Sequence, residues 1–203
     1  MLSKAIICSL LLCLLSGSTL AVPVAGLVPS ASIIAPEPSF ADNPAWPEAG
    51  EFSWEWPVPG FQYLSASFAD PYYLTHTGID IVGRSAGLIL GAPIYAVDSG
   101  EVIFAGWSPS SGYCAIVETD TEISGHRVIT RYMHMSALAL TSRDFGTRID
   151  TWRILGYVGS TGNSSGPHLH LDVNARDIHG ALPQRHAIDP MLFFAHLYVP
   201  MQP

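Results

Sequence analysis

The chain has 203 residues and a formal net charge of −8, with 48% hydrophobic and 13% charged residues. This length suits one ordinary domain with appendages, and the hydrophobic share is sufficient for a packed core. The negative charge argues against a nucleic-acid partner, since such proteins need a basic patch to neutralise phosphates. With three cysteines, no glycine period and no heptad run, the chain is not a disulfide scaffold, a collagen or a coiled coil.

The first 21 residues have the pattern of a secretory signal peptide. Lys4 precedes an apolar run from Ala5 to Leu15, and small residues lead to a cleavage position after Ala21. The apolar run is shorter than the ~18–20 residues that a membrane-spanning helix needs. We therefore expect a cleaved signal peptide over residues 1–21. An uncleaved membrane anchor is the alternative.

Prolines are dense in the stretch that follows, from Val22 to Pro59. Proline removes a backbone donor and favours extended geometry in the residue before it. We therefore expect a semi-stiff linker over 22–45 and an extended lead-in near 46–60. The tryptophans of the lead-in would need cover, so the alternative is that it packs on the domain. We place the domain at 46–198 and a short tail at 199–203.

The domain itself shows short alternating patterns that are typical of β-strands. They cover residues 78–82, 93–97, 101–105, 113–118, 127–132, 154–158 and 168–173. Clusters of Gly, Asp, Ser and Pro separate them at intervals of roughly ten to twenty residues, which favours an all-β sandwich or barrel over alternating strands and helices. A helical stripe is suggested only in 189–198.

One of these patterns carries polar groups that could form a site. His168, His170 and Asp172 alternate with Leu169 and Leu171. Side chains alternate across a strand, so the three polar residues share one face while the leucines face the core. This face is either the wall of a functional site or an ordinary solvent-exposed strand surface.

A second cluster lies near the start of the domain, at His76 and Asp80. A neutral imidazole and a carboxylate are both good zinc ligands, and Gly78 allows a tight bend between them. Together with His168 or His170 they would supply three protein ligands and leave a fourth position for water. That arrangement is typical of a catalytic zinc site, in which the metal lowers the pKa of the bound water toward ~7.

Three motifs together resemble the lysostaphin/LytM-type zinc metallopeptidases. They are His76–Asp80, Tyr132–Ser136 and Gly159–His170, in the order that the family has them. The resemblance covers roughly residues 57–195. Members of this family are bacterial peptidoglycan endopeptidases, so the resemblance implies a duplicated-hybrid-motif fold: an antiparallel β-sandwich or barrel-like structure with long loops and little helix.

The resemblance also implies a role for each matching residue. His76, Asp80 and His170 match the family's metal ligands, and the implied cofactor is Zn²⁺. His134 and His168 match the catalytic histidines, which would move protons or stabilise the oxyanion while zinc activates a water. The implied reaction is hydrolysis of a peptide bond in a stem peptide or cross-bridge of peptidoglycan. The division of work between the two catalytic histidines stays open.

Four other residues are candidates for supporting roles. Tyr72 or Tyr73 could donate to the oxyanion; the alternative is that both are rim or core aromatics. Asp172 stands where the family often has Glu and could orient an imidazole from behind. Gly162 lies in a glycine-rich turn that would let a substrate backbone approach closely.

The alternative function is a non-catalytic wall-binding or amidase-regulating module of the same fold. Such modules usually lack one or more of the metal or catalytic residues, whereas all five matching positions are filled here. We expect a monomeric enzyme, secreted or held in the bacterial cell envelope, with peptidoglycan as its substrate. We expect no nucleic-acid partner, and membrane contact only if the signal peptide is retained. The bond that is cleaved stays open between a glycine bridge, a link from D-alanine to a diamino acid, and another cross-link.

Overall fold

The computed structural model describes residues 52, 54–72, 75–85, 87–123, 125–175, 187–194 and 196–202. The expected signal peptide (1–21) and linker (22–45) lie outside these residues, as does the beginning of the lead-in. Within the described ranges, no helix has both the length and the apolar character that crossing a membrane requires.

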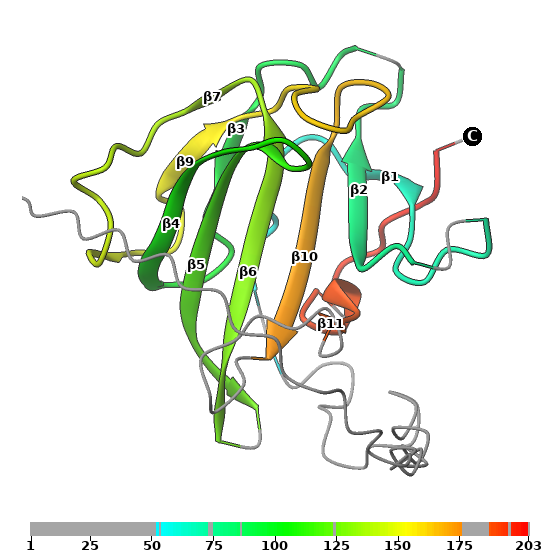
Figure 1. Ribbon diagram of the computed structural model, residues 1–203. Helices are drawn as coiled ribbons and strands as arrows, with labels where there is room; N and C mark the ends of the chain where they lie inside the picture. The colour runs from blue at the N-terminus through cyan, green and yellow to red at the C-terminus, as the bar shows by residue number, and fades with distance from the viewer. Residues whose placement is uncertain are drawn as a thin grey trace, which may run out of the picture. The chain divides into compact units, whose positions relative to one another are not determined.

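The described residues form two antiparallel sheets (Figure 1). The larger sheet has eight strands: β1 (Tyr63–Ala66), β2 (Gly78–Val82), β10 (Leu169–Ala175), β6 (His126–Met135), β5 (Gly112–Ile123), β4 (Gly100–Ser108) and β8 (Arg148–Ile149) in spatial order, with β11 (Ala187–Ile188) paired to β10. The smaller sheet has the order β3 (Pro93–Tyr95), β9 (Ile154–Tyr157) and β7 (Ala137–Leu138). A 3-10 turn, η3 (Pro190–Leu192), follows β11 where a helical stripe was expected. The prediction of an all-β, antiparallel fold with little helix is confirmed.

The alternating sequence of β2 and β10 separates the core from the opposite face of the sheet. Ile79 lies opposite Leu171 in the register, and both side chains are fully buried in the hydrophobic core. Because the side chains alternate, Asp80 and His170, which also lie opposite each other, point away from that core. Residues of the smaller sheet, such as Ile94 and Leu155, complete the same core.

The lead-in packs into the domain through its aromatic side chains. Trp54 is 3% exposed and stacks on Phe193 with ring centroids 4.0 Å apart. Its indole Nε1 donates to Thr121 Oγ1 at 2.9 Å, which satisfies the polar end of the buried ring. Trp56 is also buried and meets Phe194 edge to face. The alternative for this segment, ordered packing on the domain, therefore holds for the part of it that the structure describes.

Residues expected to form a tail also take part in the fold. The Leu64 N–H donates to the Pro200 carbonyl at 3.0 Å, and the Gln202 N–H donates to the Leu64 carbonyl at 2.7 Å. Residues 200–202 thus run parallel to β1 along the side that β2 does not occupy. This segment therefore covers part of the sheet edge, where an edge strand would otherwise present unpaired backbone groups.

We predict that Trp54→Ala lowers the free energy of unfolding by about 3–5 kcal/mol, because it opens a cavity beneath the stack with Phe193. Urea denaturation would measure the loss. The control is Trp107→Ala at a side chain that is 53% exposed and contacts Tyr113 edge to face, where the loss should stay below about 1.5 kcal/mol. Equal small losses in the two variants would show that the lead-in is not part of the cooperative unit.

Candidate active site

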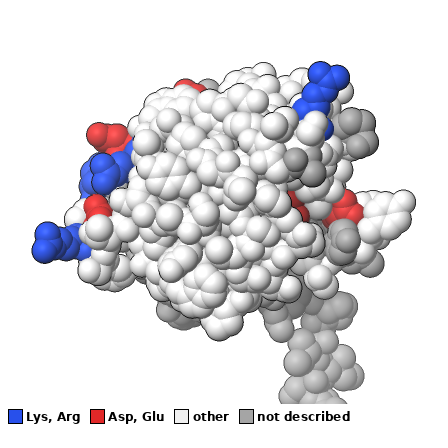
Figure 2. All heavy atoms as spheres, turned by 90° about the horizontal axis from the view of Figure 1, so that it is seen from above, with Lys and Arg blue, Asp and Glu red and all other residues white. Residues whose placement is uncertain are grey.

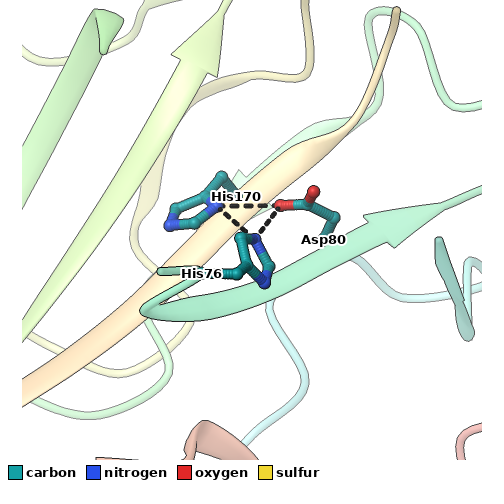
Figure 3. A group of neighbouring side chains, drawn as sticks. All are labelled: His76, Asp80 and His170. Atoms are coloured by element: carbon teal, nitrogen blue, oxygen red, sulfur yellow. Dashed lines mark hydrogen bonds and ion pairs between the residues drawn. The ribbon is translucent and has the colours of Figure 1, made fainter. Parts of the chain in front are cut away.

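Three polar groups converge where β2 and β10 lie side by side (Figure 3). His170 Nδ1 lies 2.8 Å from Asp80 Oδ1. His76, just before β2, places its Nε2 3.1 Å from the same carboxylate oxygen and 3.1 Å from His170 Nδ1. The antiparallel register is responsible for this meeting, because it sets Asp80 directly across from His170.

The acceptor groups on the outer side of the two imidazoles indicate which nitrogen carries the proton. His76 Nδ1 lies 2.7 Å from the Ser67 carbonyl, which can only accept, so this nitrogen donates and Nε2 has the lone pair. His170 Nε2 faces Asp172 Oδ2 at 3.7 Å, so the proton belongs on Nε2 and the lone pair on Nδ1. Two nitrogen lone pairs and the Asp80 oxygen therefore point at one another. Such an arrangement needs a cation.

The pKa shifts of this cluster also indicate that a positive charge is stabilised there. Burial opposes a charge on His170, but Asp172 and Asp80 outweigh burial and raise the pKa of His170 to about 9. Burial also raises the pKa of Asp80, yet hydrogen bonds from His170 and His76 lower it far below its ordinary value. The site thus favours a carboxylate with a positive charge beside it, which either a proton or a metal ion can supply.

The donor set and spacing fit a divalent metal ion. The three atoms are 2.8–3.1 Å apart, close to the ~3.3 Å that separates the ligands of a tetrahedral zinc with bonds of ~2.0–2.1 Å. Two imidazole nitrogens and one carboxylate oxygen are typical zinc ligands, and three of them leave one tetrahedral position for water or substrate. The same three residues form the candidate metal-holding group in the described part of the chain.

Gly78 is required by close packing between the strands rather than by the bend that we expected. It is the first residue of the extended strand β2, directly opposite Asp172. A Cβ there would lie 2.3 Å from the Leu171 carbonyl oxygen and 2.9 Å from His170 Nε2. Only glycine lets the His170 ring lie against β2 at this position.

Arg131, which the sequence analysis missed, lies behind His170. Its Nε donates to Asp172 Oδ1 at 2.6 Å and its Nη2 to Asp172 Oδ2, a bidentate pair between β6 and β10. Asn174 Nδ2 adds a bond of 3.0 Å to the same carboxylate, whose side chain is fully buried. The pair balances a charge that would otherwise be costly to bury, and it holds the carboxylate against His170.

His134 ends the long strand β6 in an unusual backbone conformation. Its φ is 62°, in the left-handed region that non-glycine residues seldom adopt. The Ser111 carbonyl accepts its N–H at 2.8 Å, and its Nδ1 donates to the Thr161 carbonyl at 2.8 Å. Burial lowers the pKa of His134, so the ring is neutral at pH 7 with its lone pair on Nε2. Strain of this kind is concentrated at functional sites.

His168 lies between His134 and the three converging groups. Its ring centroid is 4.9 Å from that of His134, and its Nε2 lies 3.6 Å from Asp80 Oδ1. The Gly166 carbonyl accepts from Nδ1 at 2.8 Å, so the Nε2 nitrogen is the one directed toward the cluster. The structure thus brings all five histidine and aspartate residues selected from the sequence into one place.

The other expected residues are placed less favourably. Tyr72 is 91% exposed, outside the buried cluster, and Tyr73 lies outside the described residues. Gly162 has a φ of 75°, and a Cβ there would lie 2.3 Å from the Gly112 backbone nitrogen. Its small size therefore serves the packing of its loop on the β4–β5 hairpin, which supports the Thr161 carbonyl beside His134.

A sequence profile of Peptidase family M23 matches residues 74–190, more than half of the chain. The chain belongs to this family. The match includes every residue of the cluster and confirms the resemblance drawn from the three motifs.

Curated relatives agree with this assignment, and a solved structure shares the fold. The chain is 32% identical over 125 residues to glycyl-glycine endopeptidase ALE-1 of Staphylococcus capitis (61% of this chain, 31% of the relative). It is 27% identical over 94 residues to peptidoglycan DD-endopeptidase ShyA of Vibrio cholerae (46% and 20%). The fold matches the catalytic domain of lysostaphin from Staphylococcus simulans with a TM-score of 0.50 at 24% identity, covering 72% of this chain and 93% of that domain. The chain thus spans under a third of the length of either curated relative.

We predict that Arg131→Ala lowers the free energy of unfolding by about 3–5 kcal/mol, because it leaves the Asp172 carboxylate buried without its partner. Urea denaturation again gives the measurement. The matched control is Arg127→Ala on the same strand, whose side chain is 46% exposed and pairs loosely with Glu118 at 3.7 Å. That loss should stay below about 1 kcal/mol. Similar losses in both variants would contradict a structural role for the Arg131–Asp172 pair.

Proposed function

We propose that this chain is a zinc endopeptidase that hydrolyses peptide bonds in the stem peptides or cross-bridges of peptidoglycan. The observation that carries the proposal is the convergence of three potential ligand atoms, from His76, Asp80 and His170, next to two further imidazoles. Membership of Peptidase family M23 supports it. So do the names of the two relatives, both of which are endopeptidases.

In this proposal His76, Asp80 and His170 hold the zinc ion. When bound, zinc would polarise the scissile carbonyl and lower the pKa of a bound water toward neutrality. The groups behind the ligands orient them for metal binding, because the Ser67 carbonyl and the Asp172 carboxylate keep the two lone pairs directed inward. Ligands that are held this way lose little further freedom when the metal binds.

His134 and His168 act on the protons of the reaction. Burial keeps His134 neutral, so its Nε2 can accept the proton of the attacking water and pass it to the leaving amine. The Nε2 of His168 also faces the cluster. From there an N–H on this nitrogen can donate a hydrogen bond to the oxygen of the scissile carbonyl. The backbone carbonyls of Thr161 and Gly166 prevent either ring from turning away.

The proposed substrate implies a location outside the cytoplasm. Peptidoglycan lies in the cell envelope, and the signal-like residues 1–21 are consistent with export to it or beyond. The competing function, a wall-binding or amidase-regulating module, would need neither an intact ligand set nor a neutral histidine beside it. The complete cluster therefore favours the enzyme.

We predict that the purified chain releases muropeptides from peptidoglycan and that a chelator abolishes the release. Metal analysis should find about one zinc per chain, and added zinc should restore activity to the chelated protein. Mass spectrometry of products from a glycine-bridged wall and a directly cross-linked wall identifies the bond. Cleavage that persists without metal, or zinc binding without cleavage of either wall, would contradict the proposal.

We predict different outcomes for substitutions of the two kinds of histidine. His134→Ala should lower kcat by roughly 10²–10⁴-fold and keep the zinc content, because it removes a proton acceptor and no ligand. His170→Ala should lose both zinc and activity, because it removes one of three protein ligands. His126→Ala, in the first residue of β6, is the control and should change neither. Loss of zinc in His134→Ala would assign that residue a ligand role instead.

A further inference from the structure

A hollow lies beside His168, where β2 ends and β10 begins. It is open to solvent, and its walls are mostly small and polar residues, among them Ser65, Gly83, Ser165 and Gln202, together with Val82 and Pro167. None of the described residues that line it is Lys, Arg, Asp or Glu. Figure 2 shows the molecule from this end of the sheet, and the charged side chains lie mainly toward its margins. A ligand in the hollow would be recognised by hydrogen bonds rather than by charge.

A second hollow, with different walls, lies on the β6 side of the cluster. Its lining includes Phe104, Ile116 and Met133, with the edge of Arg131. Met133 is directly opposite His170 in the register, and the Ser111 carbonyl in the same lining accepts from the His134 N–H. The histidine cluster is therefore flanked by an apolar hollow and a polar one. An extended peptide that crosses the cluster would extend toward the apolar hollow at one end and toward the polar hollow at the other.

Gln202 reaches the polar hollow from a segment outside the part of the chain that matches the family profile. Its backbone N–H donates to the Leu64 carbonyl at 2.7 Å. Its side-chain Nε2 donates to the Gly83 carbonyl at 3.1 Å, so the carboxamide is held at one end. A carboxamide with its nitrogen engaged still has its oxygen as an acceptor, and the direction of that oxygen is fixed.

We propose that Gln202 forms one wall of a substrate subsite on the His168 side of the centre. The subsite holds an extended, uncharged stretch of the peptide, whose backbone amide hydrogen-bonds to the Gln202 side-chain oxygen. Serine and glycine on the other walls leave room for the peptide backbone and offer further hydrogen-bonding groups. This inference rests on the proposed function and adds a substrate-binding residue to it.

Binding can be measured apart from turnover by placing each variant in a His134→Ala background. The probes are cross-linked muropeptide dimers, released by a muramidase from a glycine-bridged wall and from a directly cross-linked wall. Gln202→Ala should weaken the Kd of the bound dimer by about 3- to 10-fold, as expected for one lost hydrogen bond. Ser165→Ala, at an exposed position on another wall of the hollow, should weaken it in the same direction.

The matched control is Tyr198→Ala, whose side chain is 87% exposed and is not among the residues of the hollow. Its Kd should stay within about twofold of the parent. An unchanged Kd in Gln202→Ala would overturn the proposal, and so would absence of binding by the parent, the His134→Ala variant. A parent that binds the dimers tightly while the full chain with His134 cleaves neither wall would refute the endopeptidase function and leave the subsite standing.

Discussion

The candidate centre depends on one buried carboxylate. Asp172 has no exposed side-chain surface, yet it faces His170 and is paired with Arg131 and Asn174. A buried charge is tolerated only where partners satisfy it, and here the partners come from two neighbouring strands. The pairing of β6 with β10 is therefore tied to the orientation of the His170 ring, and through it to the position of the lone pair that meets His76 and Asp80.

The rings of the four histidines of the centre are oriented in the same way. In each, one ring nitrogen is directed at an acceptor of the fold, and the other nitrogen faces the cluster. The acceptors are backbone carbonyls for three of them (Ser67, Thr161 and Gly166) and the Asp172 carboxylate for His170. A carbonyl at the end of a loop can orient a ring only if the loop itself is held. The packing of the loop around Gly162 on the β4–β5 hairpin provides this for His134.

Much of the larger sheet could be predicted from the sequence, and the reasons are local. The pattern 78–82 coincides with β2, because two isoleucines alternate there with smaller or polar residues. The strands β1, β7, β8 and β11 were not predicted, because no alternating pattern marks them and their pairing depends on the assembled fold. Likewise, the histidines and Asp80 stand out in motifs, whereas Arg131 acquires its importance only from a partner on another strand.

The segments on either side of the family-matched region have a consequence for how this domain could be transplanted. A module cut to residues 74–190 would lack β1, residues 200–202, and the aromatic stack of Trp54 on Phe193. The strand β2, which carries Asp80, would then be the outermost strand of the sheet, with its backbone groups free to pair with a second molecule. In this protein β1 covers that edge of β2, and residues 200–202 cover β1 in turn, so an excised domain would have to include both segments to keep the strand that carries Asp80 paired on both sides.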